Sequence, residues 1–337
     1  MVSRFRVSYS RALLAHGYGQ ADHKMLYDEF RAMNSDIVLA ASGKDPVVIN
    51  QGFVRSRQFI NQSETRFTRF TETSELAELN RSAGSWFQAS AEMFEVIQLA
   101  YNLAVETGGL FDPAILPALK RAGYDRSMDE IRNLVPRDGL VEQIEIGDDP
   151  DQDFRKVQLD AKTRSIFLPP GLQVDLGGIA KGWIAEQVAR KLASVSNACA
   201  VSAGGDIFLV NLPNGEPDWE IGLENPLVPE ENLAVLHVMP GAVATSSTAK
   251  RQWKHNGHFQ HHLIDPRSGE PAQSEWLSTT VWAEQAAEAE VYAKVLLIAG
   301  PNNADELFKQ QTSKAYLAVD KNGWVHGSKN YHEVFHV

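Results

Sequence analysis

The chain has 337 residues, 43% of them hydrophobic and 22% charged, a balance typical of a globular protein with a sizeable core. Its formal net charge is −11, with acidic residues spread along the chain, so it lacks the basic footprint of a protein that binds nucleic acid or an anionic membrane surface. The single cysteine, Cys199, lies in an apolar run and cannot pair within the chain, which excludes internal disulfide chemistry and favours a buried thiol.

The N-terminal residues contain arginines, but their apolar run "ALLA" is shorter than the roughly 7–15 residues of a signal peptide. No stretch approaches transmembrane length, and no lipobox is seen, so we expect a soluble, cytoplasmic protein. No linker or repeat divides the chain. We expect a poorly ordered extension over residues 1–27, a single domain over 28–330 and a C-terminal tail over 331–337.

Apolar residues at helical spacing predict helices over residues 88–107, 179–192 and 284–299, the first and third of which end at glycines. Runs typical of strands lie at residues 36–41, 156–168, 206–210, 219–224, 233–239, 276–283 and 315–325. The pairs Asn256-Gly257 and Asn322-Gly323 predict tight hairpin turns. Strands dominate after residue 195 without regular alternation with helices, which indicates an α+β fold with largely antiparallel sheets and flanking helices.

Residues 174–187 read "VDLGGIAKGWIAEQ" and place glycines and a lysine between an apolar run and a helix. The spacing matches neither a P-loop nor a dinucleotide-binding glycine motif. Glycines at a helix start nevertheless let backbone N–H groups approach an anion. The stretch is therefore either a phosphate-binding loop or a tight turn before a helix, and the residues alone leave both open.

Histidines gather in "RQWKHNGHFQHHLIDPRSGEP", residues 251–271, which predicts a hairpin with His255 facing His258. Imidazoles on one face can hold zinc, but no Cys or carboxylate completes a known ligand spacing, so a polar hairpin face is favoured. His261 is predicted on the opposite face. The following Asp265-Pro266-Arg267-Ser268-Gly269 has the composition of a turn, although a histidine and a carboxylate at a strand end also suit acid–base chemistry.

A further interruption occurs in "VSAGGDIFLV", residues 201–210, where two glycines and Asp206 break an apolar run. A bulge at a sheet edge and a close approach of backbone to a ligand are both compatible with it. In the second case Asp206 would accept hydrogen bonds from ribose hydroxyls or hold a cation.

Taken in order, several motifs resemble those of the ApbE family, the FAD-dependent protein FMN transferases. The resemblance covers roughly residues 28–330. It rests on "FRAMNSDIVL" (30–39), "SELAELN" (74–80), "TGGLFDPAILPAL" (107–119), "VDLGGIAKG" (174–182), "SAGGDI" (202–207), "ATSS" (244–247), "HLIDPRSGEP" (262–271) and "AEVYAKVLLIAG" (289–300). It implies an α+β fold of two related halves with mixed sheets, and transfer of FMN from FAD to a threonine hydroxyl of an acceptor flavoprotein, with release of AMP and usually with magnesium.

The resemblance also implies site residues. It makes His262 the candidate for positioning or deprotonating the acceptor hydroxyl, and it puts Lys181 near the phosphates and the Ala180 carbonyl toward the metal. Thr245 and Ser246 would shape the pocket near the metal and the phosphates. Contacts with FAD are implied at Met33, Ser74, Leu76, Asp112, Gly177, Gly178, Lys181, Gly205, Asp206 and Asp265.

This chain departs from the family at the helix that holds the metal, which normally reads Ala-Asp-x-x-x-Thr. The matching positions are Glu290 and Lys294. Glutamate can still bind magnesium through oxygen, but an ammonium group has no lone pair to offer. Either Glu290 still carries magnesium, or Lys294 places its ammonium where the cation sits, or the two form an ordinary i,i+4 pair on an exposed helix.

Three functions follow as hypotheses. The first is transfer of FMN from FAD to a threonine of an acceptor protein. The second is an FAD-binding or FAD-hydrolysing relative that has lost transfer, and the third is an α+β domain that binds no flavin. The altered metal helix separates the first two hypotheses, and a yellow, flavin-loaded protein would exclude the third.

Overall fold

The computed structural model describes residues 25–133, 152–228, 231–249, 252–255, 258–309, 311 and 313–335. The chain divides into two compact units, each assembled from separated stretches of sequence. Unit 1 comprises Met1–Gln62, Lys181–Ser247 and Glu275–Val337, and unit 2 comprises Ser63–Ala180 and Thr248–Ser274. Residues 1–24 of the expected N-terminal extension lie outside the described residues.

Unit 1 is built on one antiparallel sheet, which has eight strands within the described residues. From edge to edge the strands are β1 (Leu26–Ala32), β2 (Ser35–Ser42), β6 (Ala198–Ala203), β7 (Asp206–Val210), β10 (Gly241–Ser247), β15 (Trp276–Ala283), β16 (Ala315–Asp320) and β17 (Val325–Gly327). β2 pairs with β6 in the register Ala41↔Cys199. Strands that are far apart in sequence are thus neighbours in the sheet.

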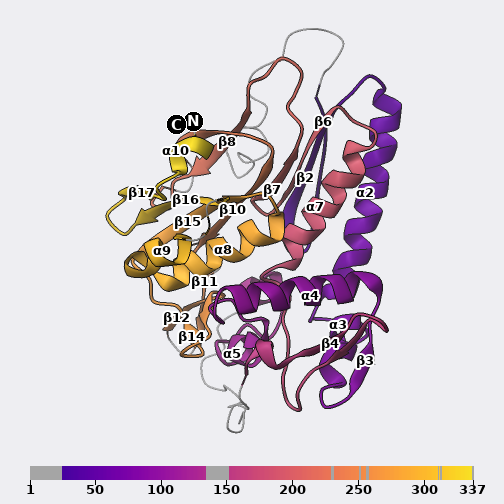
Figure 1. The fold of residues 1–337 in the computed structure, drawn as a ribbon, viewed down its shortest axis with the longest axis vertical. Helices are drawn as coiled ribbons and strands as arrows, with labels where there is room; N and C mark the ends of the chain where they lie inside the picture. The colour runs from indigo at the N-terminus through magenta and orange to yellow at the C-terminus, as the bar shows by residue number, and fades with distance from the viewer. Residues whose placement is uncertain are drawn as a thin grey trace. The chain divides into compact units, whose positions relative to one another are not determined.

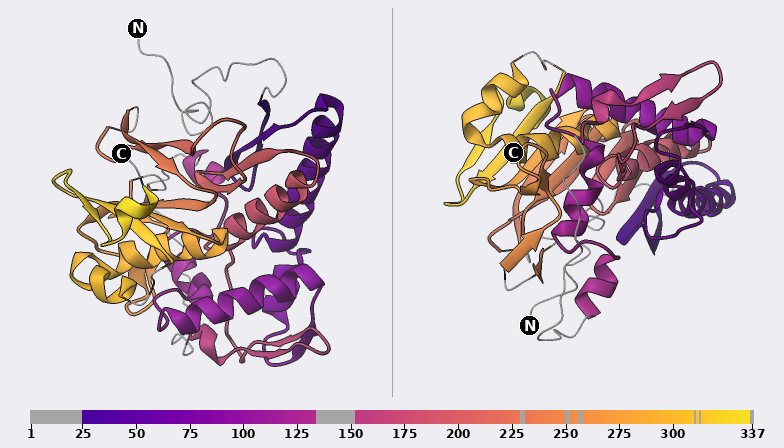
Figure 2. Two further views of the ribbon diagram at one scale, coloured as in Figure 1. Left: turned by 45° about the horizontal axis from the view of Figure 1, so that its top comes forward. Right: turned by 90° about the horizontal axis from the view of Figure 1, so that it is seen from below.

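Three helices of unit 1 lie near one another: α2 (Pro46–Phe67), which runs on into unit 2, α7 (Ala180–Ala193) and α8 (Ala286–Ala299). α2 and α7 run side by side, as Figures 1 and 2 show. Between them the ring of Phe59 packs against that of Trp183, with the ring centroids 6.2 Å apart. α8 packs on β10 and β15, where Thr279 Oγ1 donates to the Ala293 carbonyl at 2.6 Å. α9 (Pro301–Phe308) follows α8 directly.

The opposite face of this sheet carries a second core. Alternating residues such as Ile207 and Leu209 point to this face because side chains alternate along a strand. They pack against Trp219 of β8 (Trp219–Glu224) and Leu236 of β9 (Asn232–Val238), which form an antiparallel pair. The expected C-terminal tail contributes as well, since α10 (Tyr331–Val334) is followed by Phe335, which is buried in the same core.

Unit 2 combines helices with short strands. Its helices are α3 (Glu75–Arg81), α4 (Ala91–Glu106), η1 (Pro113–Ile115), α5 (Leu116–Arg121), α6 (Met128–Asn133) and η2 (Phe154–Lys156). β3 (Trp86–Gln88), β5 (Ser165–Phe167) and β4 (Gln158–Asp160) form a small sheet in that order. Two hairpins complete the unit: β11 (Gln252–His255) with β12 (His258–His261), and β13 (Ile264–Asp265) with β14 (Glu270–Pro271). The first hairpin is anchored by Trp253, whose Nε1 donates to the Ala122 carbonyl at 2.7 Å.

The predicted α+β class is confirmed, since helices combine with antiparallel sheets throughout the described residues. The three predicted helices correspond to α4, α7 and α8. β16 pairs with β17 across Asn322-Gly323 as predicted, and His255 pairs with His258, although residues 256–257 lie outside the described residues. The apolar run before the glycine loop, residues 172–176, belongs to no strand.

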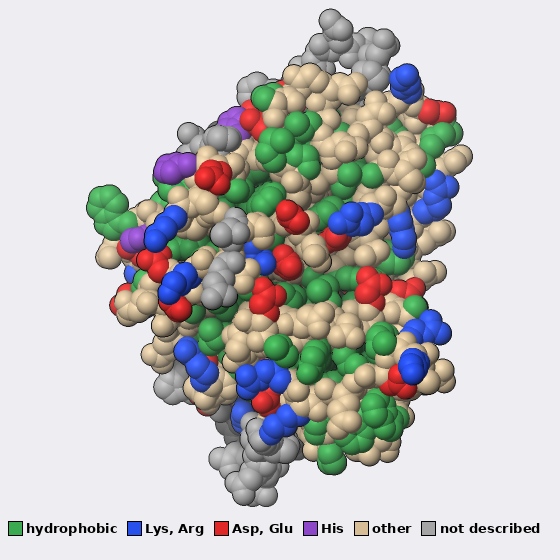
Figure 3. All heavy atoms as spheres, viewed as in Figure 1, with side chains coloured by type: hydrophobic (Ala, Val, Ile, Leu, Met, Phe, Trp, Pro, Cys, Tyr) green, Lys and Arg blue, Asp and Glu red, His purple; other side chains and the backbone are tan. Residues whose placement is uncertain are grey.

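The distribution of charge on the surface agrees with the sequence, in which acidic and basic residues are spread along the chain. On the face drawn in Figure 3, acidic and basic side chains are interspersed rather than segregated. Among the described residues, no helix has the length and apolar character needed to cross a bilayer.

Candidate functional site

The first turn of α7 carries Lys181, and Gly182 follows it. A Cβ at position 182 would lie 2.6 Å from the carbonyl oxygen of Ala286, so only glycine lets α7 approach the start of α8 this closely. The approach brings the α7 backbone within reach of Glu290 on α8. The Gly182 N–H donates a hydrogen bond of 2.8 Å to Glu290 Oε2.

Four charged side chains meet here, and we call them the charge cluster: Lys181, Asp206, Glu290 and Lys294. Lys181 Nζ lies 2.9 Å from Asp206 Oδ2 and also contacts Glu290 Oε1. Lys294 Nζ lies 3.0 Å from the same Glu290 oxygen. The exposed fraction is 1% for the Glu290 side chain, 12% for Lys181 and 15% for Lys294. The cluster therefore holds two positive and two negative charges that are largely shielded from water.

Two opposing effects act on the pKa of Glu290. Burial by itself raises it, because a carboxylate loses hydration. The ammonium groups of Lys181 and Lys294, with the Gly182 N–H, outweigh burial and lower the pKa from 4.5 to about 2. The pKa of Lys294 is lowered, since burial and the Lys181 charge together outweigh the attraction of the carboxylates. Glu290 is thus a firmly ionised carboxylate at neutral pH.

The residues of the altered metal helix do not fit magnesium. Within the described residues, no group of three or more His, Cys, Asp or Glu side chains is placed to hold a metal ion. Glu290 is already bonded by two ammonium groups and an amide, and Lys294 carries no lone pair. Thr245 Oγ1 lies 2.9 Å from Thr280 Oγ1 of the neighbouring strand. A hard dication requires several oxygen ligands, which these side chains do not present together.

Two hairpin turns of unit 1 hold further predicted residues. Met33 and Asn34 connect β1 to β2 with φ values of 54° and 52°. Gly204 and Gly205 connect β6 to β7 with φ values of 68° and 100°. The turns are adjacent, because the Gly204 N–H donates to the Asp36 carbonyl at 3.0 Å. The glycines before Asp206 therefore form a hairpin turn and not the bulge that was one of the two alternatives.

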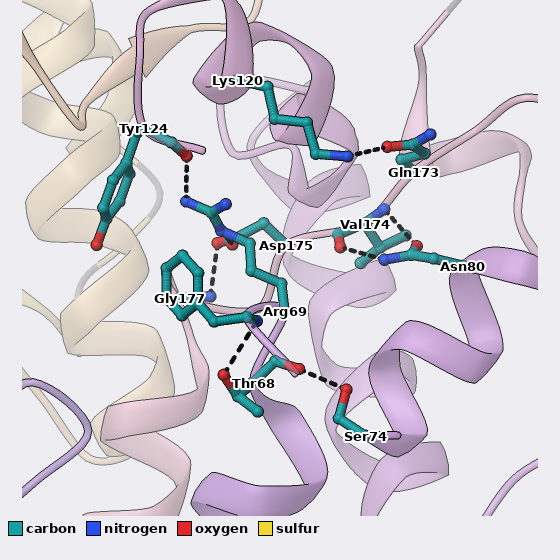
Figure 4. A network of polar contacts seen from close by, with 11 residues as sticks. Thr68, Arg69, Ser74, Asn80, Lys120, Tyr124, Gln173, Val174, Asp175 and Gly177 are labelled. Atoms are coloured by element: carbon teal, nitrogen blue, oxygen red, sulfur yellow. Dashed lines mark hydrogen bonds and ion pairs between the residues drawn. The ribbon is translucent and has the colours of Figure 1, made fainter. Parts of the chain in front are cut away.

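The glycine loop lies in unit 2. Asp175 Oδ1 accepts the Gly177 N–H at 2.8 Å, and Asp175 Oδ2 lies 2.7 Å from Arg69 Nε. Asn80 bonds both backbone groups of the preceding Val174, at 2.7 and 2.9 Å. Figure 4 shows these side chains converging on the loop. The Gly177 amide is thus already used within the protein. Arg69, Asn80 and Asp175 were not among the predicted site residues, although Asn80 lies in the motif "SELAELN" and Asp175 in "VDLGGIAKG".

Three predicted FAD contacts of unit 2 have structural roles of their own. Ser74 is the N-cap of α3, where its Oγ accepts the Ala77 N–H at 3.0 Å and donates to the Thr68 carbonyl at 2.6 Å. Leu76 is fully buried in the core, so only its backbone remains for a ligand. Asp112 accepts the N–H groups of Ala114 at 2.7 Å and Phe154 at 3.3 Å.

Asp112 also has an unusual proton affinity. Burial raises the pKa of its carboxyl from 3.8 to about 6, and the two backbone N–H bonds offset this only in part. The carboxyl therefore titrates close to neutral pH, unlike most aspartates.

His262 is half-buried and lies between β12 and β13, next to His261, whose Nε2 lies 3.0 Å from the Ala272 carbonyl oxygen. Burial lowers the pKa of His261, which indicates a neutral imidazole. Asp265 forms a fork with Arg267 at 2.9 and 2.7 Å. Burial raises the Asp265 pKa, but the Arg267 bonds prevail and lower it. Asp265 is therefore an ionised turn residue beside His262 in sequence.

Comparison with known proteins supplies the family. The model of the ApbE family matches residues 36–317. A protein of Klebsiella pneumoniae (strain 342) named "FAD:protein FMN transferase" is 28% identical over 297 residues, which cover 86% of this chain and 87% of that protein. One of the same name from Treponema pallidum is 29% identical and covers 74% of this chain and 72% of its own length.

Solved structures agree in fold. The crystal structure of the ApbE protein of Thermotoga maritima has a TM-score of 0.76 at 22% identity and covers 93% of this chain and 100% of that chain. The flavin transferase ApbE of Vibrio cholerae has a TM-score of 0.73 at 20% identity, covering 93% and 99% of the two chains.

Proposed function

Because the chain belongs to the ApbE family, we propose that it is a flavin transferase that moves the FMN half of FAD onto a hydroxyl group of an acceptor protein and releases AMP. The observation that carries the proposal is the family match over residues 36–317, joined by relatives that bear this activity in their names. The buried charge cluster at the start of α7 supports it, because a pyrophosphate needs neighbouring positive charge.

The proposed reaction makes one phosphorus–oxygen bond and breaks another. A threonine hydroxyl oxygen of the acceptor attacks the phosphorus of the FMN half, and its proton passes to a base. The electron pair of the broken pyrophosphate bond leaves with the AMP phosphate. Catalysis then consists mainly of aligning the nucleophile and neutralising phosphate charge. We assign the proton to His262, because histidine is the side chain that most often acts as a general base.

The charge cluster provides the positive charge in this proposal. Lys181 and Lys294 share one oxygen of Glu290. Either ammonium can therefore turn to a phosphate oxygen while the other keeps the carboxylate paired. Asp206 limits the freedom of Lys181 through its own ion pair. This leaves Lys294 as the more available cation.

We further propose that Lys294 takes the place of the magnesium that the family resemblance implies. The proposal is supported by the ammonium pair on Glu290 and by the poor fit of these side chains to a dication. A lysine neutralises phosphate charge as a point charge and needs no octahedral set of oxygen ligands.

The test measures covalent FMN on a threonine-containing acceptor by intact-protein mass spectrometry, with and without a chelator. Wild type is expected to transfer FMN in both conditions. Lys294→Ala is expected to lose about a hundredfold in rate, the usual effect of removing one group that stabilises a transition state. Lys294→Thr is expected to be inactive in chelator and to regain transfer with added magnesium, since threonine restores an oxygen ligand.

The matched control is Lys309→Ala, which removes an exposed lysine paired with Glu306 at 3.4 Å on α9. It is expected to behave as wild type. If the wild-type protein loses FMN transfer in chelator, the proposed role of Lys294 is contradicted, and Glu290 would be the residue that binds magnesium. Absence of covalent FMN on every acceptor, with FAD still bound, would favour a relative that binds or hydrolyses FAD without transfer.

A further inference from the structure

The segment that leads into the glycine loop belongs to no sheet, yet its backbone is tightly held. The Val174 N–H donates to Asn80 Oδ1 at 2.7 Å, and Asn80 Nδ2 donates back to the Val174 carbonyl at 2.9 Å. The Asp175 N–H donates to the Pro113 carbonyl at 2.8 Å. Contacts from α3 and η1 thus replace the pairing that a neighbouring strand would supply.

Arg69 anchors the next residue. Its Nε lies 2.7 Å from Asp175 Oδ2, with exposed fractions of 5% for Arg69 and 13% for Asp175. Its Nη2 donates to the Tyr124 carbonyl at 2.6 Å, and its guanidinium lies over the rings of Phe70 and Tyr124 at 4.3 and 4.6 Å. These contacts fix the plane of the guanidinium, so Asp175 is held in one orientation.

Asp175 in turn fixes the backbone of the glycine loop. Its Oδ1 accepts the Gly177 N–H at 2.8 Å, and a Cβ on Gly177 would lie 2.9 Å from that oxygen. A side chain at position 177 would therefore push the carboxylate away. The same contact commits the Gly177 amide to Asp175. An anion that binds at this loop would therefore have to use the following amide, that of Gly178.

We infer that Arg69 and Asp175 are positioning residues for the pyrophosphate of FAD, an inference that rests on the proposed function. Asp175 aims the loop, but its negative charge would repel a phosphate at Gly178. Arg69 cancels that charge at a distance of 2.7 Å. The ion pair therefore aligns the loop, and its positive half reduces the electrostatic repulsion between Asp175 and a bound phosphate.

If the ion pair has this role, substitution of Arg69 and substitution of Asp175 should change the Kd of FAD by different amounts. Arg69→Met leaves an uncompensated carboxylate beside the phosphates and is expected to raise the Kd of FAD by about tenfold or more. Asp175→Asn keeps an oxygen for the Gly177 N–H and leaves a spare positive charge, so its Kd is expected to stay within about threefold of wild type. The double variant Arg69→Met/Asp175→Asn is expected to bind FAD more tightly than Arg69→Met alone.

The experiment combines FAD titration by flavin fluorescence with hydrogen exchange of residues 172–180 followed by mass spectrometry. Arg69→Met is expected to raise deuterium uptake in this stretch, whereas Asp175→Asn raises it less. Arg69→Lys serves where Arg69→Met does not fold, because lysine keeps the charge but cannot reach both Asp175 and Tyr124. The matched control is Arg66→Met, which breaks an ion pair with Glu75 at 3.2 Å elsewhere in unit 2.

A purely structural ion pair would lower the melting temperature equally in both single variants and leave their FAD Kd values equal. That result, or unchanged exchange in residues 172–180 of a folded Arg69→Met, would overturn the inference. Failure of the proposed function would give a different result, because the wild-type protein would then bind no FAD. The hydrogen-exchange measurement would still show whether the Arg69–Asp175 ion pair holds the loop.

Discussion

At the scale of single residues, Glu290 is the group on which the charge cluster depends. Its carboxylate is bonded by Lys181, Lys294 and the Gly182 N–H. We expect Glu290→Gln to destabilise the protein by about 3–5 kcal/mol, because two buried ammonium groups lose their shared counter-charge. Urea denaturation monitored by tryptophan fluorescence would measure the loss.

The control for this prediction is Glu306→Gln, which removes a carboxylate that pairs with Lys309 on the surface. Exposed pairs of this kind contribute about 0–1 kcal/mol. A Glu290→Gln variant as stable as the Glu306→Gln control would show that the cluster is not held together by its charges.

The raised pKa of Asp112 predicts how the stability of the protein depends on pH. The folded carboxyl has a pKa of about 6 against an ordinary 3.8. Between these values the folded state binds more protons than the unfolded state, so the contribution of Asp112 to stability falls as the pH rises from about 4 to about 6. Asp112→Asn does not titrate and is expected to remove this component. The difference in melting temperature between wild type and Asp112→Asn, followed from pH 4 to 7, measures it, and a flat difference would contradict the raised pKa.

Sequence reasoning identified the residues of the charge cluster but not Arg69, Asn80 and Asp175, which hold the glycine loop. Lys181 was identified because it lies in a recognisable motif, and Glu290 and Lys294 because they depart from one. Arg69 lies in none of the quoted motifs, and the quoted motifs that contain Asn80 and Asp175 do not reveal their contacts with Val174 and Arg69, about a hundred positions away in the chain. A contact between such distant residues depends on the fold and leaves no periodic signal in the sequence.

At the scale of elements, the crossing of α7 and α8 is set by one glycine. We expect Gly182→Ala to destabilise the protein by about 1–3 kcal/mol, since its Cβ would press on backbone atoms of Ala286 and Ala287. Gly52→Ala on α2 is the matched comparison, because its Cβ would meet the movable end of the Leu192 side chain at 2.9 Å.

Alanine is favoured over glycine in a helix by about 1 kcal/mol, so Gly52→Ala is expected to be near neutral. Denaturant midpoints of the two variants check the contrast. Equal midpoints would show that α7 and α8 separate at little cost.

The elements that the sequence predicted were those with strong patterns. α4, α7 and α8 follow an apolar spacing, and glycines follow the ends of α4 and α8. The 22-residue helix α2 was not predicted. Its buried stripe contains Ser56 and Ser63 between Ile49, Phe53, Ile60 and Phe67, so the apolar repeat is broken by small polar residues.

At the scale of the whole molecule, the net charge of −11 opposes the approach of FAD, which is itself an anion. Salt screens this long-range repulsion. We expect the association rate constant of FAD to rise roughly two- to fivefold between 20 and 200 mM NaCl. Stopped-flow fluorescence measures it, with the Kd recorded at both concentrations. A rate that falls with salt would mean that the local positive charge governs the encounter.

Fold class was accessible from the sequence because strands and helices leave local patterns, but the division of the chain was not. Unit 1 draws on three separate stretches and unit 2 on two. None of the four boundaries, which follow residues 62, 180, 247 and 274, is marked by a linker in the sequence, and the first of them falls inside helix α2. Such a division is decided by contacts made after folding, which composition cannot reveal.

The pairing of β2 with β6 has a consequence for synthesis on the ribosome. β2 ends at Ser42, and its partner begins only at Ala198, so more than 150 residues are made between them. At about 5–20 residues per second, this interval lasts roughly 8–30 s. Throughout it the nascent hairpin of β1 and β2 presents an apolar strand, "SDIVLAAS", with one edge unpaired. We therefore expect chaperones that shield strand edges to bind the growing polypeptide until translation delivers the missing strand.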